Sequence, residues 1–294
     1  MTRSGFVALA GRPNAGKSTF VNRVVGEHVA IVSDKPQTTR RALRGIATTA
    51  DHQLVLVDLP GVQRPRDPLT ERMQKRVEHE LKESDAALFL INGEQSVGPG
   101  DRFIARAIRS AGVPAVTVVN KIDKLRKPQA AEALQAAADL GVEGEVFPIS
   151  ARTGEGVADL VTHLAALLPE GEFLYPAEDR SDQSERVRLA ELVREQVLLR
   201  TREELPHAVE VEVEDIAERE DDGLLMIQAL VWAETDSQKG ILVGKGGSMV
   251  RAIGTAARGQ IEALEGRKVH LDLHVRVRKG WRRDDGLLDR LGIE

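Results

Sequence analysis

The first residues suited to chemistry form a Gly-rich loop near the start of the chain, Gly11-Arg12-Pro13-Asn14-Ala15-Gly16-Lys17-Ser18. Glycines let several backbone N–H groups point into one concavity, which can hold an anion. A helix that begins at the end of the loop adds the positive end of its dipole. We therefore expect Lys17 to reach the β- and γ-phosphates of a nucleotide and Ser18 to ligate Mg²⁺. For this loop alone, the alternative is a Gly-rich turn that arises by chance.

A carboxylate follows a later apolar segment, in Asp58-Leu59-Pro60-Gly61. We expect Asp58 to hold Mg²⁺ through a water molecule and the Gly61 N–H to contact the γ-phosphate.

A third group, Asn120-Lys121-Ile122-Asp123, predicts recognition of guanine. Asp123 can accept hydrogen bonds from the ring N–H and the exocyclic amine of guanine, a donor pair that adenine lacks. We expect Asn120 to face the other edge of the base and the Lys121 stem to pack over its plane. In a fourth group, Ser150-Ala151-Arg152, a backbone N–H, that of Ala151, is expected to meet the guanine carbonyl.

Apolar segments place these groups at strand ends. The pattern predicts strands at 6–10, 43–49, 53–57, 86–91, 114–119 and 146–149. It predicts helices at 19–25, 69–82, 101–110, 129–139 and 157–167. Alternation of strands and helices indicates an α/β domain, with a mostly parallel sheet covered by helices on both faces.

Residues 5–168 resemble a translation-factor-type GTPase through these four motifs. The resemblance implies that Thr38 and Thr39 are switch threonines; it leaves open which one ligates Mg²⁺, with Thr39 favoured. The residue after Gly61 is Val62, where many GTPases have a Gln that orients the attacking water. This resembles the hydrophobically substituted GTPases, whose intrinsic hydrolysis is slow. Asn14 resembles an Asn that coordinates potassium in some of them, so a potassium ion is a hypothesis here.

Composition limits the remaining possibilities. A length of 294 residues predicts about two domains, and the absence of cysteine fits a reducing cytoplasm. No signal segment and no long apolar run is visible, so we expect a soluble, cytoplasmic protein. The chain carries a net charge of −5, yet residues 237–294 contain twelve Lys and Arg against seven Asp and Glu. That excess indicates a local polyanion site, or alternatively a solvated charged face.

The second half of the chain predicts a different domain. We expect domain boundaries at 1–170 and 185–294, joined by a Pro-, Gly- and acid-rich linker at 171–184. Residues 185–277 predict the order helix, strand, strand, helix, Gly-Lys-Gly-Gly, helix, strand, which is that of a smaller α+β type II KH domain. In this domain, Gly244-Lys245-Gly246-Gly247 would clamp a single-stranded RNA backbone. Residues 241–243, with Ile241 first, would line a groove for bases, and Arg251 and Arg258 would flank it. The alternative is a Gly turn between packed helices.

The combination of the two domains resembles the Era family of bacterial GTPases over essentially the whole chain. The resemblance implies GTP hydrolysis with Mg²⁺, binding near the 3′ end of the small-subunit ribosomal RNA and a role as a switch in small ribosomal subunit assembly. Peripheral association with the inner membrane face is also a family property, although no membrane-binding helix is visible, and we expect a monomer. Two alternatives remain, a potassium-activated GTPase coupled to RNA modification and a passive RNA-binding scaffold that holds GTP.

The site residues implied by the resemblance are as follows. Those expected to bind GTP are Gly11, Arg12, Pro13, Asn14, Ala15, Gly16, Lys17, Ser18, Thr19, Thr38, Thr39, Asp58, Leu59, Pro60, Gly61, Val62, Asn120, Lys121, Ile122, Asp123, Ser150, Ala151 and Arg152. Catalysis is expected to involve Asn14, Lys17, Thr39 and Gly61, and Mg²⁺ to be held by Ser18, Thr39 and Asp58. RNA is expected to contact Ile241, Gly244, Lys245, Gly246, Gly247, Arg251 and Arg258.

Overall fold

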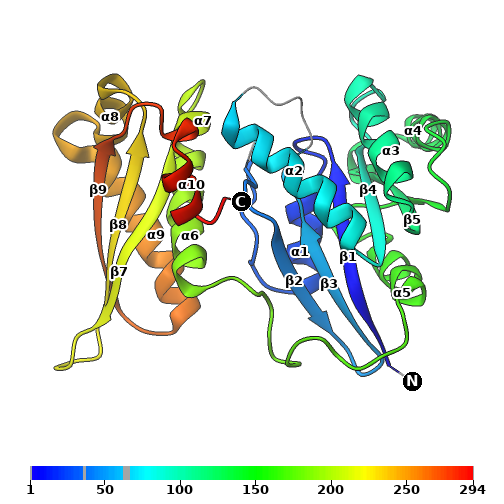
Figure 1. Ribbon diagram of the computed structural model, residues 1–294, viewed down its shortest axis with the longest axis horizontal. Coiled ribbons are helices and arrows are strands. Elements are labelled where there is room, and N and C mark those ends of the chain that lie inside the picture. Colours follow the sequence, from blue (N-terminus) through cyan, green and yellow to red (C-terminus); the bar gives the residue numbers. More distant parts are fainter. Residues whose placement is uncertain (1, 36–37, 62–66, 294) are drawn as a thin grey trace. The chain divides into compact units, whose positions relative to one another are not determined.

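The computed structural model describes residues 2–35, 38–61 and 67–293 (Figure 1). It divides into two compact units, Met1–Asp182 with Ile293–Glu294, and Gln183–Gly292. The division between Asp182 and Gln183 lies inside the segment 171–184 that the sequence predicts as a linker.

The first unit is an α/β fold built on a six-stranded sheet of order β2-β3-β1-β4-β5-β6. β2 is antiparallel to β3 and the other pairs are parallel. Its strands are β1 (Arg3–Gly11), β2 (Leu43–Thr48), β3 (His52–Asp58), β4 (Ala86–Asn92), β5 (Ala115–Asn120) and β6 (Val146–Pro148). Its helices are α1 (Lys17–Val25), α2 (Pro68–Glu83), α3 (Pro99–Ala111), the short η1 (Ile122–Lys124), α4 (Lys127–Ala138) and α5 (Val157–Leu167). The predicted fold class is confirmed for this unit.

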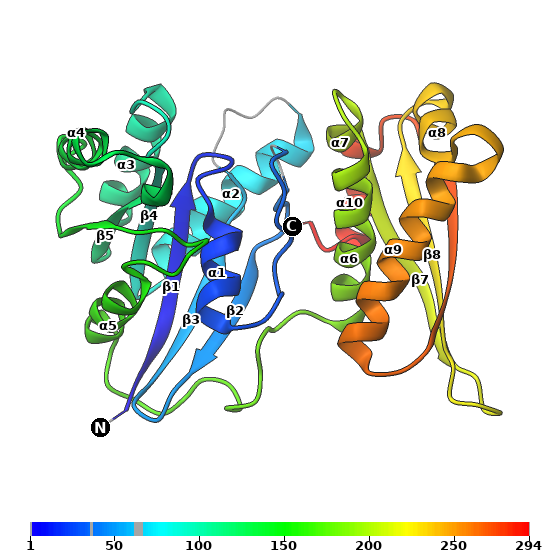
Figure 2. The same ribbon diagram turned by 180° about the vertical axis from the view of Figure 1, so that it is seen from behind.

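Helices cover both faces of this sheet, which explains the continuous apolar runs of its central strands (Figures 1 and 2). Phe20 of α1 and Leu160 of α5 belong to one core cluster. Val77 of α2 and Ile104 of α3 belong to another. Since β1, β3, β4, β5 and β6 run parallel, the loops after them gather at one edge of the sheet, where an open α/β sheet binds its ligand.

Residues 169–182 run along the first unit as an extended strap. The Gln53 side chain on β3 is fully buried. Its Oε1 accepts from the N–H groups of Leu174 and Tyr175 at 2.8 and 2.9 Å, and its Nε2 donates to Tyr175 O at 2.9 Å. Further on, the Ile46 N–H donates to Arg180 O at 2.9 Å. The strap therefore holds to the first unit through both side-chain and backbone hydrogen bonds.

The second unit is an α+β fold with a three-stranded sheet of order β7-β8-β9, in which β7 and β8 are antiparallel and β8 and β9 parallel. Its strands are β7 (Glu210–Glu218), β8 (Leu225–Ala233) and β9 (Val269–Val277). Its helices are α6 (Glu185–Arg200), α7 (Leu205–Ala208), α8 (Asp236–Val243), η2 (Lys245–Gly247), α9 (Ser248–Glu265), η3 (Trp281–Arg283) and α10 (Asp285–Arg290). The predicted element order is confirmed, with α7, η3 and α10 as additions.

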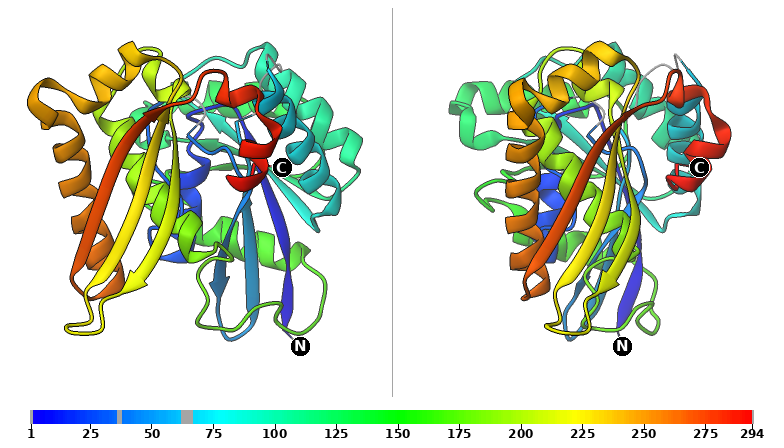
Figure 3. Two further views of the ribbon diagram at one scale, coloured as in Figure 1. Left: turned by 60° about the vertical axis from the view of Figure 1, so that its left-hand side comes forward. Right: turned by 90° about the vertical axis from the view of Figure 1, so that its left-hand side faces the viewer.

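Helices α6 and α9 pack on one face of this sheet (Figures 2 and 3). Their buried side chains, such as Val193 and Ile261, share a core cluster with Val211 and Ile227 of the strands. The Trp281 ring is also fully buried, and its Nε1 donates to Ala208 O at 2.9 Å. Within the described part of the chain, no helix is long and apolar enough to cross a membrane.

Candidate functional site

The Gly-rich loop between β1 and α1 depends on glycine for two different reasons. Gly16 has a φ of 96°, and a Cβ there would lie 2.2 Å from Asn120 Nδ2. A Cβ on Gly11 would lie 2.6 Å from Leu90 O on the neighbouring strand. Lys17 is buried, with Nζ 3.2 Å from Gly11 O and 3.4 Å from Arg12 O. The Lys17 side chain therefore folds back over the loop, with its ammonium on carbonyl groups of the loop that would receive the phosphates.

Three oxygen-bearing side chains meet at the end of this loop. Ser18 Oγ donates to Asp58 Oδ2 at 2.7 Å, and Thr39 Oγ1 lies 3.2 Å from the same oxygen and 3.3 Å from Ser18 Oγ. Asp58 Oδ1 is buried and has no hydrogen-bond partner among the described residues. Hydroxyl and carboxylate oxygens are the ligands that Mg²⁺ prefers, so this set fits the metal.

Electrostatics supports a cation at this point. Burial raises the pKa of Asp58, against the opposing effects of the Lys17 charge and the hydrogen bonds from Ser18 and Thr39. Burial likewise lowers the pKa of Lys17, against the charge of Asp58. A divalent cation would favour the ionised form of the buried carboxylate.

The structure separates the two switch threonines. Thr39 Oγ1 contacts Asp58, whereas Thr38 Oγ1 donates to Lys35 O at 2.7 Å. Of the two threonines, Thr39 is therefore the one that lies with the Ser18 and Asp58 oxygens expected to hold Mg²⁺. Val62 lies outside the described residues, as does Gln63.

On the base side, Asn120 differs from the expectation that its amide faces the base. The residue is 2% exposed. Its Nδ2 donates to Ala15 O at 2.8 Å, and its Oδ1 accepts from the N–H groups of Ala151 at 2.9 Å and Lys121 at 2.8 Å. Asn120 thus ties the Gly-rich loop to the Ser150–Arg152 loop. The Ala151 N–H, expected at the guanine carbonyl, is used in this brace.

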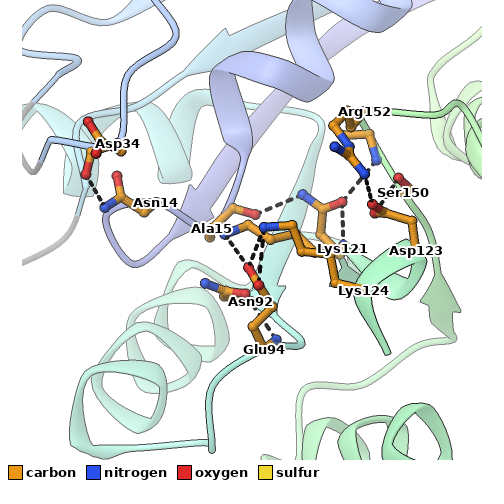
Figure 4. Close-up of polar contacts among 12 residues, drawn as sticks. Asn14, Ala15, Asp34, Asn92, Glu94, Lys121, Asp123, Lys124, Ser150 and Arg152 are labelled. Atoms are coloured by element: carbon orange, nitrogen blue, oxygen red, sulfur yellow. Dashed lines mark hydrogen bonds and ion pairs between the residues drawn. The ribbon is translucent and has the colours of Figure 1, made fainter. Parts of the chain in front are cut away.

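Asp123 lies beside the Ser150–Arg152 loop, as the motifs predict (Figure 4). Ser150 Oγ donates to its Oδ1 at 2.7 Å, and Arg152 Nη2 lies 2.6 Å from its Oδ2. The hydrogen bond from Ser150, with that from Arg152, holds the pKa of Asp123 below its usual value. The carboxylate is therefore ionised at neutral pH and accepts from donors on both oxygens.

Sequence reasoning missed Glu94, in the loop after β4. Glu94 Oε2 lies 3.1 Å from Lys121 Nζ, and Glu94 Oε1 lies 3.1 Å from Lys124 Nζ. Hydrogen bonds from these lysines lower the pKa of Glu94. Glu94 thereby fixes the lysine whose stem was expected over the base, and its isolated position in the sequence carries no signal for this role.

A pocket of about 490 Å³ is lined by several of these residues, namely Lys17, Ser18, Thr39, Glu94 and Lys121. The Gly-rich loop lines it from one side and residues 31–35, 38 and 39 from the other. Asn14, at a φ of 63°, donates from Nδ2 to Asp34 O at 2.6 Å and so ties the two sides together. The pocket's mixed polar lining and position at the sheet edge fit a nucleotide.

A second Gly-rich loop, in the other unit, joins α8 to α9. Gly244, Gly246 and Gly247 all have positive φ, of 72°, 59° and 77°. A Cβ on Gly244 would lie 2.8 Å from the Met249 backbone N, so this position requires glycine. Lys245 is exposed. Bare backbone between two helices, with a lysine beside it, is suited to an approaching phosphate group.

The residues around this loop only partly match the expectation. Ile241 is 54% exposed, whereas Leu242 is fully buried in the core and cannot line a groove. Arg251 and Arg258 are exposed on α9. Arg251 also lines a concavity of about 450 Å³ with Arg200 of α6, a basic residue that sequence reasoning missed because it lies on a distant helix.

Comparison with known proteins gives the family. Residues 6–121 match the family model described as a 50S ribosome-binding GTPase, and residues 204–282 match the KH domain model. The chain is 45% identical over 295 residues to GTPase Era of Mycolicibacterium smegmatis, covering 99% of both chains. It is 47% identical over 296 residues to GTPase Era of Mycobacterium tuberculosis, covering 99% of this chain and 98% of the other.

Solved structures agree with this result. A single-residue variant of Aquifex aeolicus Era bound to GDP·AlF₄⁻ has a TM-score of 0.93 and 33% identity, with 99% of both chains covered. An Era structure in complex with MgGDPNP and nucleotides 1506–1542 of 16S ribosomal RNA has a TM-score of 0.94 and 33% identity, with 100% of this chain and 99% of the other covered. Since these relatives are 33–47% identical and are matched over at least 98% of both chains, the chain belongs to the Era family of GTPases.

Proposed function

We propose that this GTPase binds GTP and Mg²⁺ in its first unit and single-stranded RNA near the 3′ end of the small-subunit ribosomal RNA in its second. It acts as a GTP-controlled switch in assembly of the small ribosomal subunit. The observation that carries the nucleotide half is the meeting of Ser18, Thr39 and Asp58 at one point. Thr39 belongs to a segment between regular elements, so its contact depends on how that segment lies.

Each group at the site has one part in the reaction. Backbone N–H groups of the Gly-rich loop and the Lys17 ammonium hold the β- and γ-phosphates, and the Gly61 N–H contacts the γ-phosphate. Ser18 and Thr39 would hold Mg²⁺ directly and Asp58 would hold it through water, and the ion would supply positive charge to these phosphates. Asp123 accepts from the guanine base. Water attacks the γ-phosphorus, and the bond from that phosphorus to the β–γ bridging oxygen breaks. GDP leaves with the bridging oxygen, and the water's proton passes to the inorganic phosphate.

Intrinsic hydrolysis is slow in this proposal, because Val62 has no group to orient water. A potassium ion held beside Asn14 would supply further positive charge. Turnover that is equal in potassium and sodium buffers would contradict this part.

RNA binding relies on the second glycine loop. The backbone of residues 244–247, which is half-buried to exposed, and the Lys245 ammonium take phosphates. Ile241 offers an exposed apolar surface to a base, and Arg251 and Arg258 add positive charge. The bound 16S fragment in the related Era structure supports this choice of RNA. The protein acts as a cytoplasmic monomer, with weak peripheral association at the inner membrane face; size-exclusion chromatography and vesicle co-sedimentation test these two parts.

The test is GTP hydrolysis with and without an RNA copying the 3′ segment of small-subunit ribosomal RNA. Stimulation by this RNA, but not by its reverse complement, supports the switch. Fast turnover without RNA favours an enzyme whose task is turnover itself, and no turnover in either case favours a scaffold. Lys17→Ala, which removes the phosphate contact, gives the background rate.

A further inference from the structure

The carboxylate of Asp123 has a donor on each oxygen (Figure 4). Ser150 Oγ donates to Oδ1 at 2.7 Å and Arg152 Nη2 to Oδ2 at 2.6 Å. Guanine would present its ring N–H and exocyclic amine to the same two oxygens. The protein's own donors and those of the base therefore address one acceptor group.

The two protein donors differ in freedom. Ser150 is fully buried, and its Oγ also accepts from the Thr153 N–H at 3.1 Å, so it is fixed in place. The Arg152 side chain is 71% exposed. A guanidinium at the surface can rotate into solvent at little cost, whereas the Ser150 hydroxyl has no such path.

The backbone beneath Arg152 is held still. Arg23 of α1 donates from Nε to Ala151 O at 3.2 Å and from Nη2 to Arg152 O. The Ala151 N–H donates to Asn120. Movement at this position is therefore confined to the Arg152 side chain.

The pocket agrees with this arrangement. Its lining reaches Lys121, but among the described residues it includes neither Asp123 nor Arg152. The Asp123 side chain is only 10% exposed. The Arg152 guanidinium thus covers the Asp123 carboxylate beside Lys121, at the end of the pocket where the base would bind.

We propose that Arg152 competes with guanine for the carboxylate of Asp123 and thereby speeds release of guanine nucleotides. The proposal rests on the guanine site assigned above. When the base binds, the guanidinium leaves Oδ2 for solvent; when it returns, the base loses one acceptor. An exposed ion pair of this kind contributes up to about 1 kcal/mol, so it can change the balance between the guanidinium and the base on the carboxylate by up to about fivefold.

Release of a fluorescent N-methylanthraniloyl GDP, chased with excess GDP in a stopped-flow instrument, tests the proposal on the full chain. Arg152→Gln is expected to slow release by about two- to fivefold. Arg126→Gln removes the same charge at another exposed arginine, three residues from Asp123, and is expected to leave release unchanged. Unchanged or faster release in Arg152→Gln would overturn the proposal, since Arg152 would then not compete with the base.

Asp123→Asn separates this inference from the guanine site itself. An asparagine should shift the preference from GDP to XDP, because xanthine presents an acceptor where guanine presents an amine. A variant that still prefers GDP would refute the guanine site. If the preference does shift, Arg152→Gln in the Asp123→Asn background should no longer alter XDP release. A persisting two- to fivefold effect would mean that Arg152 acts on something other than the carboxylate.

Discussion

Replacement of Asn120 by alanine tests whether the brace between the two nucleotide loops holds the site together. The change removes the donor to Ala15 O and the acceptor of the Ala151 N–H. Both atoms belong to residues that are at most 1% exposed, so water cannot replace the lost partner. We expect GDP affinity to fall together with stability.

The magnitude follows from these two orphaned groups. A buried polar group left without a partner costs about 1–3 kcal/mol, which gives about 2–6 kcal/mol for the pair. At about 2–4 °C per kcal/mol for a unit of this size, a mid-range loss of about 4 kcal/mol lowers the melting temperature by about 8–16 °C.

Differential scanning calorimetry of the full chain measures the transition of the first unit, and titration with GDP measures binding. Asn92→Ala is the matched control, because Asn92 ends the neighbouring strand in register with Asn120 and its Oδ1 accepts the nearby Glu94 N–H at 3.1 Å. We expect about 1 kcal/mol or less for that local bond. Equal shifts in the two variants, or Asn120→Ala without a change in melting temperature, would refute the brace.

Three further predictions concern the metal, the RNA and pH. Thr39→Ala should weaken Mg²⁺-dependent GTP hydrolysis by at least about tenfold while Thr38→Ala changes it little; equal losses in a phosphate-release assay would contradict the assignment of Thr39. Gly247→Asp should abolish binding of the ribosomal RNA segment in a filter assay, through its positive φ and its negative charge, and should leave GTP binding intact; loss of both would contradict independent sites. Because its pKa is lowered, Asp123 stays ionised at every pH above the usual pKa of an aspartate and also somewhat below it. Its carboxylate stops accepting hydrogen bonds from the base only as the pH falls through the depressed pKa. GDP binding should therefore show no Asp123-dependent loss over about pH 5–8, and Arg152→Gln should move the acid limit upward in a titration; a limit that does not move would exclude an Arg152 contribution.

The sequence predicted what depends on local order. The spacing of glycine, lysine and serine predicted a loop between a strand and a helix at residues 11–18, and the apolar run before Asp58 predicted that this carboxylate ends a strand. The hydrogen bond from the Asn120 side chain to Ala15 O could not be predicted, because the two residues lie 105 positions apart. No local pattern indicates that they meet. The same applies to Arg23 and Glu94, whose roles depend only on which loops the sheet brings together.

Composition alone does not show how residues 171–184 are held, although the division between the two units lies inside this segment. Proline, glycine and acidic residues predicted a linker, and no local pattern reveals that Gln53 would bond to this segment. The groups of this segment that Gln53 bonds are backbone groups of Leu174 and Tyr175, and backbone groups are present whatever the side chains are. A segment can therefore look like a tether by composition and still be fixed along a folded unit.

The strap has a consequence for the solubility of the first unit. β2 is an edge strand of the sheet, and its outward amides at Arg44 and Ile46 donate to Asp182 Oδ1 at 3.3 Å and to Arg180 O at 2.9 Å. An uncovered edge of this kind is a template for pairing with strands of other molecules. A fragment ending at residue 168 should therefore self-associate, whereas one ending at residue 182 should remain monodisperse in light scattering. The strap is thus also protection against aggregation at this edge of the sheet.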